Sequence, residues 1–422
     1  MTETITANVT GTGSMLGVGT FPTALMLPGA ESDPAIARYH RWLLDPESDS
    51  PAEVRAGLGA YAPLVDVVAY TVGLRDAPPQ EPLDGPGDLR AVVVTAQAAA
   101  FVESGEPEGA AGLLQTAAEE IAAEHPVLAG TLWANAGSLL HQAGHAEAAV
   151  PALERALVLL DGATGLDELR SEIHHELGSI AHAELLAAGQ PLREAMGHYY
   201  AALQLVTERS APLIWAGIQL DLAAAQLATP MQQATDQLRI GIAAQSLRAA
   251  RRVFDPAEHP TQWSSATLNL ANALVYLPST HQGDNLVEAV ELYEEILQSG
   301  VRDRDAAGRA RLLANQGNAL AHLGIFDHAR AKLAEARFLF ESVLDHDGAA
   351  TVRSVLDEIA KAGVSFSSDE ESADLARRAE QMARMPDAMT DATSAGMGVT
   401  IIPAEAQNRA TVTILRRDGE AS

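Results

Sequence analysis

The residues best suited to chemistry are histidines that lie close together in the sequence. Positions 174–176 read His-His-Glu, and His182 follows on the same predicted helix. A zincin-type metal site needs two His four residues apart with a Glu beside the first, whereas this His-Glu pair is followed by His seven residues on. His141 and His145 have the four-residue spacing, but a predicted turn glycine lies between them. Because no third ligand is nearby, the sequence predicts no metal site and no catalytic residue.

A glycine-rich stretch at positions 11–19 superficially resembles a phosphate-binding loop. It lacks the G-x-G-x-x-G spacing, no Walker lysine follows it, and Pro22 interrupts the helix that would receive the phosphates. The sequence therefore predicts no cofactor. The first 33 residues are interpreted as a flexible Gly/Thr-rich segment without a signal peptide.

Composition restricts the classes of partner. The chain has 422 residues, with 56 acidic against 28 basic side chains and a net charge of −28. A surface this negative repels phosphate, so we expect neither nucleic acid nor an anionic membrane as a partner. The absence of Cys excludes disulfides and thiolate metal sites. The composition and the lack of a convincing targeting segment predict a soluble, cytoplasmic, helical protein.

A pattern of small and apolar residues repeats six times along the chain. In three copies a small residue is followed by Gly after seven residues, Ala after twelve, Leu after sixteen and Ala after nineteen. In the other three copies the second half arrives five, eight or six residues late. The small residues that begin the copies, here called the anchors, are Ala98, Gly137, Gly178, Ala223, Ala271 and Gly317.

This pattern predicts stacked helical hairpins. A small anchor lets two helices approach closely, the Gly supplies a left-handed turn between them, and neighbouring hairpins bury the apolar faces that one hairpin cannot. The pattern resembles the tetratricopeptide repeat (TPR) family over residues 89–348, most closely around Gly137 and Gly317. The resemblance implies an all-α fold: a right-handed superhelical α-solenoid of about six hairpins, here with a small β-type C-terminal tail.

The sequence divides into five segments. They are the flexible N-terminal segment (1–33), N-terminal helices predicted at 34–43 and 52–74 with a Pro-rich linker (34–88), the repeat array (89–348), a capping helix (349–364), and an acidic linker with a short helix and the β-type tail (365–422). The tail contains two β-type runs, Val399–Ile402 and Ala410–Leu415. We expect these runs to pair with each other, with the N-terminal segment or with a second chain in a homodimer.

Polar residues recur at matched places on the first helix of each hairpin. Positions six before, two before, one after and five after an anchor share one helical face, because the steps are four, three and four residues. In TPR-like arrays this face lines the concave groove, and Asn amides on it can bind an extended peptide backbone. The predicted groove residues are Arg311, Asn315, Asn318, His322, Ser265, Asn269, Asn272, Tyr276, Asn135, Gln142, Glu176 and Asp221.

The sequence therefore predicts a non-catalytic adaptor or scaffold that binds a protein or peptide. Two alternatives remain open: an accessory protein for the assembly or maturation of a multi-subunit enzyme, for example a metalloenzyme such as a hydrogenase, and a peptide-sensing regulatory domain. The same asparagines could instead bond to neighbouring helices and hold the array together. Lengthened turns in three consecutive copies offer the edge of the array as another binding surface.

Overall fold

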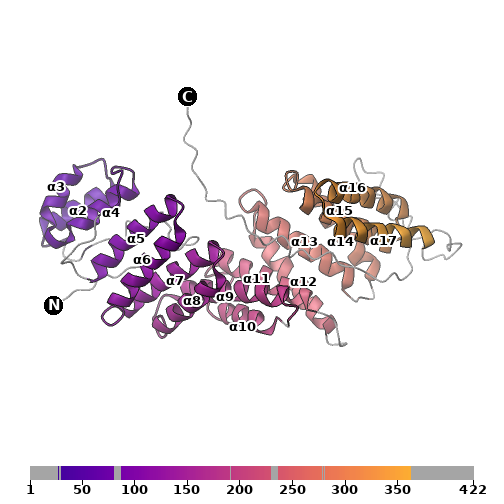
Figure 1. Cartoon of the computed structure of the whole chain (residues 1–422), viewed down its shortest axis with the longest axis horizontal. Coiled ribbons are helices and arrows are strands. Elements are labelled where there is room, and N and C mark those ends of the chain that lie inside the picture. The colour runs from indigo at the N-terminus through magenta and orange to yellow at the C-terminus, as the bar shows by residue number, and fades with distance from the viewer. Residues whose placement is uncertain are drawn as a thin grey trace, which may run out of the picture. The chain divides into compact units, whose positions relative to one another are not determined.

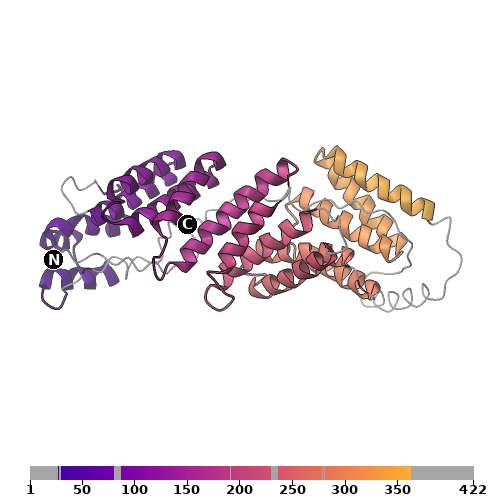
Figure 2. The same cartoon turned by 90° about the horizontal axis from the view of Figure 1, so that it is seen from below.

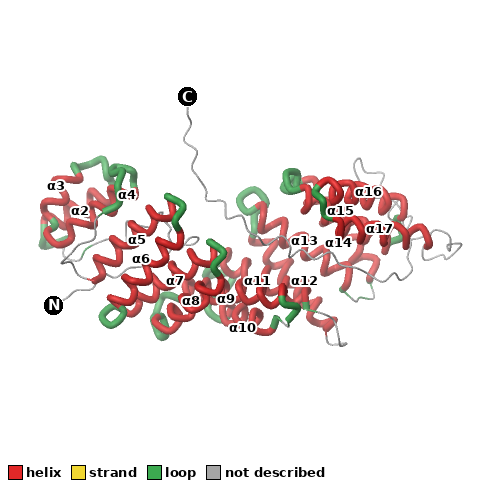
Figure 3. The backbone as a smooth tube through the Cα atoms, viewed as in Figure 1, coloured by secondary structure: helices red, strands yellow, loops and turns green. Residues whose placement is uncertain are grey.

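The computed structural model describes residue 27 and residues 30–79, 87–190, 192–229, 236–277, 279 and 281–362. Across these residues the chain forms sixteen α-helices and one short 3-10 helix, with no strand (Figure 3). None of the helices in this part of the chain is both long and apolar enough to cross a membrane. The two β-type runs and the glycine-rich stretch lie outside the described residues.

Twelve of the helices form six hairpins. The first helices of the hairpins are α5 (Gly87–Glu103), α7 (Pro126–Gln142), α9 (Asp167–Ala187), α11 (Pro212–Ala228), α13 (Pro260–Tyr276) and α15 (Ala306–His322). The second helices are α6 (Pro107–Ile121), α8 (Ala146–Leu159), α10 (Arg193–Leu203), α12 (Asp236–Val253), α14 (Gln282–Gln298) and α16 (Phe326–Ser342). Each first helix begins eleven residues before its anchor, so the sequence repeat and the structural repeat coincide.

The glycine anchors lie where the two helices of a hairpin touch. A Cβ atom added to Gly137 would lie 2.6 Å from Cγ of Leu153, and one added to Gly317 would lie 2.7 Å from Cγ of Leu333. A Cβ on Gly178 would lie 2.6 Å from Cε1 of Tyr199. In every case the neighbour is the Leu or Tyr that the repeat pattern pairs with the anchor. Only a residue without a side chain allows this approach.

Four of the hairpin turns, those after α5, α7, α9 and α15, use glycine in the left-handed region. Gly105, Gly144 and Gly324 have φ values of 82°, 86° and 70°, and the residue after each donates a backbone hydrogen bond to the carbonyl five residues earlier. This arrangement ends the first helix with a Schellman motif. Gly189 does the same for α9, with φ of 64°. After α16, Leu344 takes this position with φ of 61°, although its side chain is 76% exposed.

The three longer copies each gain one helical turn. Helix α9 ends nine residues after its anchor, whereas the other five first helices end five residues after theirs. In α12 and α14 the Ala of the pattern is the eighth residue, whereas in α6, α8 and α16 it is the fourth. Four added residues are close to one α-helical turn, so the buried face keeps its direction. The remaining inserted residues lengthen the connections.

Two helical predictions at the ends of the array needed correction. The predicted helix from 52 to 74 is divided into α3 (Pro51–Gly57), a 3-10 turn (Gly59–Tyr61) and α4 (Ala62–Thr71), because Gly59 has φ of 55° and Pro63 follows. Before them, α2 (Pro34–Leu44) agrees with the prediction to within one residue. The final helix, α17 (His346–Ala362), begins three residues earlier than expected, because Asp345 caps it by accepting from the Gly348 amide at 2.8 Å.

The chain divides into two compact units, one up to Ile214 and the other from Trp215. In the first unit each helix from α5 to α10 packs against the next, and α7 also contacts both α5 and α9 (Figure 1). In the second unit α12 to α17 pack successively in the same way, and α13 also contacts α15 (Figure 2). Within each unit, then, hairpins stack with first helix beside first helix. Each unit has its own apolar core.

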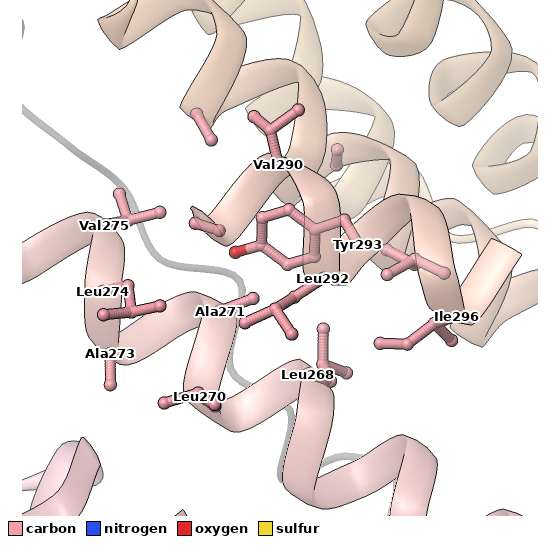
Figure 4. Packing of buried hydrophobic residues seen from close by; sticks show 14 of the residues in the cluster. Leu268, Leu270, Ala271, Ala273, Leu274, Val275, Val290, Leu292, Tyr293 and Ile296 are labelled. Atoms are coloured by element: carbon pink, nitrogen blue, oxygen red, sulfur yellow. The ribbon is translucent and has the colours of Figure 1, made fainter. Parts of the chain in front are cut away.

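In the second unit, the core between α13 and α14 shows how a hairpin closes. Leu268, Ala271 and Leu274 of α13 face Tyr293 and Ile296 of α14, and all five are almost completely buried (Figure 4). The Tyr293 ring extends from α14 toward α13, so its hydroxyl reaches the first helix through the apolar layer.

Candidate partner-binding site

Helices α13 and α15 leave one polar strip uncovered in the second unit. From Trp263 to the end of α13, and from Ala310 to the end of α15, only four residues of each helix are not buried. All eight were predicted as groove residues. This set, here called the α13–α15 polar face, comprises Ser265, Asn269, Asn272, Tyr276, Arg311, Asn315, Asn318 and His322.

Part of the α13–α15 polar face is bonded together across the two helices. The Asn315 side-chain amide donates to the side-chain oxygen of Asn272 at 3.0 Å, and the Tyr293 hydroxyl donates to the same oxygen at 2.7 Å. The Asn318 side chain hydrogen-bonds the Tyr276 hydroxyl. These contacts fix the register of the two helices, because Asn315 lies beside Asn272 and Asn318 lies beside Tyr276. Each polar residue of α15 is therefore next to the α13 residue that lies one position further along the polar face toward the helix C-terminus. These contacts also show that the asparagines do hold adjacent first helices together.

Burial changes the titration of this face. It raises the pKa of Tyr276 and Tyr293, so both phenols stay protonated at neutral pH. Burial lowers the pKa of His322, which favours the neutral imidazole. The face is therefore composed of neutral hydrogen-bonding groups, with Arg311 as its only charged member.

Hydrogen-bonding capacity is left over on the same strip. Among the described residues, the side chains of Asn269, Arg311 and Ser265 have no hydrogen-bond or ion-pair partner. The amide nitrogen of Asn272 and the side-chain oxygen of Asn315 are also unused there. Amides with spare donors and acceptors can bind the backbone of an extended chain whatever its side chains are.

The equivalent strip of the first unit has a different chemistry. The α7–α9 polar face comprises Thr131, Asn135, Ser138, Gln142, Glu172, Glu176 and Ser179. Nδ1 of His141 lies 2.9 Å from Oε1 of Glu176, which joins α7 to α9, and Gln142 donates to the Ser138 hydroxyl at 3.1 Å. Asn135 is only 4% exposed, and its side-chain oxygen has no hydrogen-bond partner among the residues that the structure describes.

Glu172 is the most perturbed carboxyl group of the α7–α9 polar face. Burial, together with the nearby charges of Glu168 and Glu176, raises its pKa from 4.5 to about 7, although His175 acts in the opposite direction. It accepts no hydrogen bond from the residues that the structure describes. A half-buried carboxylate without a hydrogen-bond donor is costly, and such groups are candidates for a functional role.

The predicted groove residues thus fall into both units. Asn135, Gln142 and Glu176 lie in the first unit, while the α13–α15 polar face and Asp221 lie in the second. Asp221 is half-buried on α11 and is not without an interaction partner.

Sequence reasoning missed two groups that complete these strips. Tyr293 occupies a position where other copies have Leu, and its hydroxyl bonds to Asn272. The equivalent Tyr199 lies with its hydroxyl 3.4 Å from Nδ1 of His182. A Tyr in an otherwise aliphatic position was the available signal, since a buried hydroxyl needs a partner. His141 was considered only as a metal ligand, but it pairs with Glu176.

No protein-family model and no curated protein matches this sequence. The class that the fold defines is therefore stated from the molecule itself: within the described residues it is an all-helical, repeat-like protein, and within each compact unit successive helices pack against one another.

Proposed function

We propose that this chain is a TPR-like α-solenoid, with the right-handed superhelix of that family, that binds a protein or peptide through its first helices. It acts without a catalytic centre, cofactor or metal, in the cytoplasm, as an adaptor or scaffold. The observation that carries the proposal is the α13–α15 polar face. Over the last three to four turns of α13 and α15, all residues are buried except these eight, which remain accessible.

The pattern of bonding within this face supports a mixed role. Asn272, Asn315, Asn318 and Tyr276 use part of their capacity to fix α13 against α15. This rigid arrangement holds the remaining donors and acceptors in place before a partner arrives, which reduces the entropy lost on binding. The side chains of Asn269 and Arg311 make no hydrogen bond or ion pair with other described residues. They supply the peptide contacts, Asn269 to backbone groups and Arg311 to a carboxylate.

The test uses the full chain, affinity-tagged in its native cell, with copurifying proteins identified by mass spectrometry. Asn269→Ala removes a side chain without internal bonds, so it should release the partners while thermal stability stays unchanged. The double variant Asn315→Ala with Asn318→Ala should also weaken capture. Partners that bind equally well to both variants would place the binding surface elsewhere.

The identity of the partners then separates the alternatives. A single recurrent enzyme subunit would favour the assembly or maturation accessory, and many unrelated partners would favour a general adaptor. Release of a transcription-linked partner by added peptide would favour the peptide-sensing regulator. Substrate turnover by the purified chain alone would contradict the non-catalytic proposal.

A further inference from the structure

The α7–α9 polar face holds two unsatisfied acceptors on one strip. The contact between His141 and Glu176 fixes the register of α7 against α9. Asn135 lies six residues before His141 on α7, and Glu172 lies four residues before Glu176 on α9. Both helices run in the same direction along the stack, so at about 1.5 Å per residue Asn135 and Glu172 lie within about one helical turn of each other along the helix axes. Asn269 and Arg311 occupy the equivalent level in the second unit.

Neither acceptor has a hydrogen-bond donor within the described part of the chain. The side-chain oxygen of Asn135 is buried and unpaired, and Glu172 accepts no hydrogen bond. Glu168 and Glu176 add negative charge near Glu172. Arg170, two residues away, is directed to Asp161 and Asp167, at 3.9 Å from each. Among the described residues, His175 opposes these charges only in part, so the strip offers acceptors and a net negative charge around Glu172.

We infer that the α7–α9 polar face binds an arginine or lysine side chain of an extended peptide, with Glu172 as its counter-charge and the Asn135 side-chain oxygen as a further acceptor. This inference rests on the proposed peptide-binding function and assigns a second site, of opposite charge preference, to the first unit. A guanidinium carries five donors and an ammonium three, and neither has an acceptor. Such a group pairs with Glu172 and compensates the charge of the carboxylate, and it donates to the Asn135 oxygen once the buried amide turns toward the strip.

Other occupants fit less well. A carboxylate or phosphate would face Glu168, Glu172 and Glu176 together and would be repelled. An apolar side chain would leave the buried Asn135 oxygen unpaired. Water can satisfy the amide oxygen but cannot compensate the charge of a half-buried carboxylate.

The experiment selects a random dodecapeptide library, displayed on phage, on the full-length protein at physiological salt. The peptide with the strongest enrichment is then synthesised and titrated against variants. We expect Arg or Lys at a fixed position of the enriched peptides. Glu172→Gln should weaken the binding of that peptide at least tenfold, and Asn135→Ala severalfold. The Glu172→Gln protein should keep its helical circular dichroism, since Gln has nearly the same shape.

The matched control is Glu184→Gln, which removes the same charge from an exposed position on the same helix. It should change the affinity less than twofold, which separates a specific site from general attraction to a protein of charge −28. Equal effects of the two Gln variants, or enriched peptides without a basic residue, would overturn the inference. Peptides that lose affinity for Asn269→Ala but not for Glu172→Gln would overturn it while leaving the proposed function intact. Failure to enrich any peptide would contradict both.

Discussion

On α13 and α15, amides and tyrosine hydroxyls bond to one another, whereas the strip on α7 and α9 carries a buried amide oxygen and a half-buried carboxyl group that have no donor among the described residues. The two strips belong to different compact units but share one repeat register. The position six residues before the anchor is Arg311 in one strip and Glu172 in the other.

This difference shows that the repeat determines where a polar side chain lies but not what it does there. The buried positions take similar residues from copy to copy, because each has a fixed space to fill. The accessible positions of each copy carry their own chemistry. The stability of each strip should therefore respond differently to substitution, although the hairpins beneath them are built alike.

The largest expected effect tests the register that both strips share. Gly137→Leu in the first unit and Gly317→Leu in the second should each lower the free energy of unfolding by about 3 kcal/mol, because the added side chain overlaps the partner helix. Thermal or urea denaturation measures the loss. Gly112→Leu is the control, since a Cβ there meets nothing within 4 Å, and it should be neutral or stabilising. Similar results for all three variants would contradict the common register.

The next effect should appear only in the α7–α9 polar face. Because the pKa of Glu172 is about 7 in the folded chain against 4.5 in an ordinary carboxyl, the folded state binds more protons between these pH values. Stability contributed by this group is therefore complete below about pH 4.5, falls as the pH rises to 7 and is constant above it. The loss should be about 3 kcal/mol.

Urea denaturation of the wild type and Glu172→Gln at several pH values measures this contribution. The Gln variant should gain stability relative to the wild type as the pH rises through that range, and the difference should level off above pH 7. A difference that is independent of pH would mean that Glu172 titrates normally.

A smaller effect should distinguish two asparagines of the α13–α15 polar face. Asn272→Ala removes the acceptor shared by Asn315 and Tyr293 and leaves the buried Tyr293 hydroxyl unpaired, at a cost of about 1–2 kcal/mol. Asn269→Ala breaks no bond within the described residues and should change the unfolding free energy by less than about 0.5 kcal/mol. Equal costs in denaturation experiments would show that the network does not stabilise the second unit.

The smallest effect concerns the turn after α16, where Leu344 takes the left-handed position that glycine occupies after α5, α7, α9 and α15. Leu344→Gly should stabilise the chain by about 0.5–1 kcal/mol, because φ of 61° is unfavourable for Leu and the exposed side chain contributes little packing. Gly144→Leu, at φ of 86°, should have the opposite sign. Destabilisation by Leu344→Gly in thermal melts would mean that the side chain has a packing role.

The hairpins could be predicted from sequence because their signal is local and repeated. Each anchor, its turn glycine and the paired Leu or Tyr lie within about thirty residues, and six copies average out chance matches. The α3–α4 break was missed because Gly59 and Pro63 lie in a segment with no second copy for comparison. The added turn of α9 was missed because its turn glycine, Gly189, is displaced from the expected position.

The polar strips were only partly predictable. The helical period identifies which residues share a face, so the eight members of the α13–α15 polar face followed from the anchors alone. Which of them bond together depends on the offset between neighbouring helices, and this offset is a tertiary quantity. The same holds for the pairing of His141 with Glu176 and for the burial of Glu172.

The extra turns in α9, α12 and α14 imply that the helices of this chain change in length by whole helical turns. Four added residues rotate the helix by about 400°, so every side chain keeps nearly its former direction, whereas two added residues would rotate the face by about 200° and turn the apolar stripe to water. Among insertions and deletions that arise by chance within the helices, selection would therefore retain those near a multiple of one turn. The copies differ in length, yet their apolar faces keep the same direction.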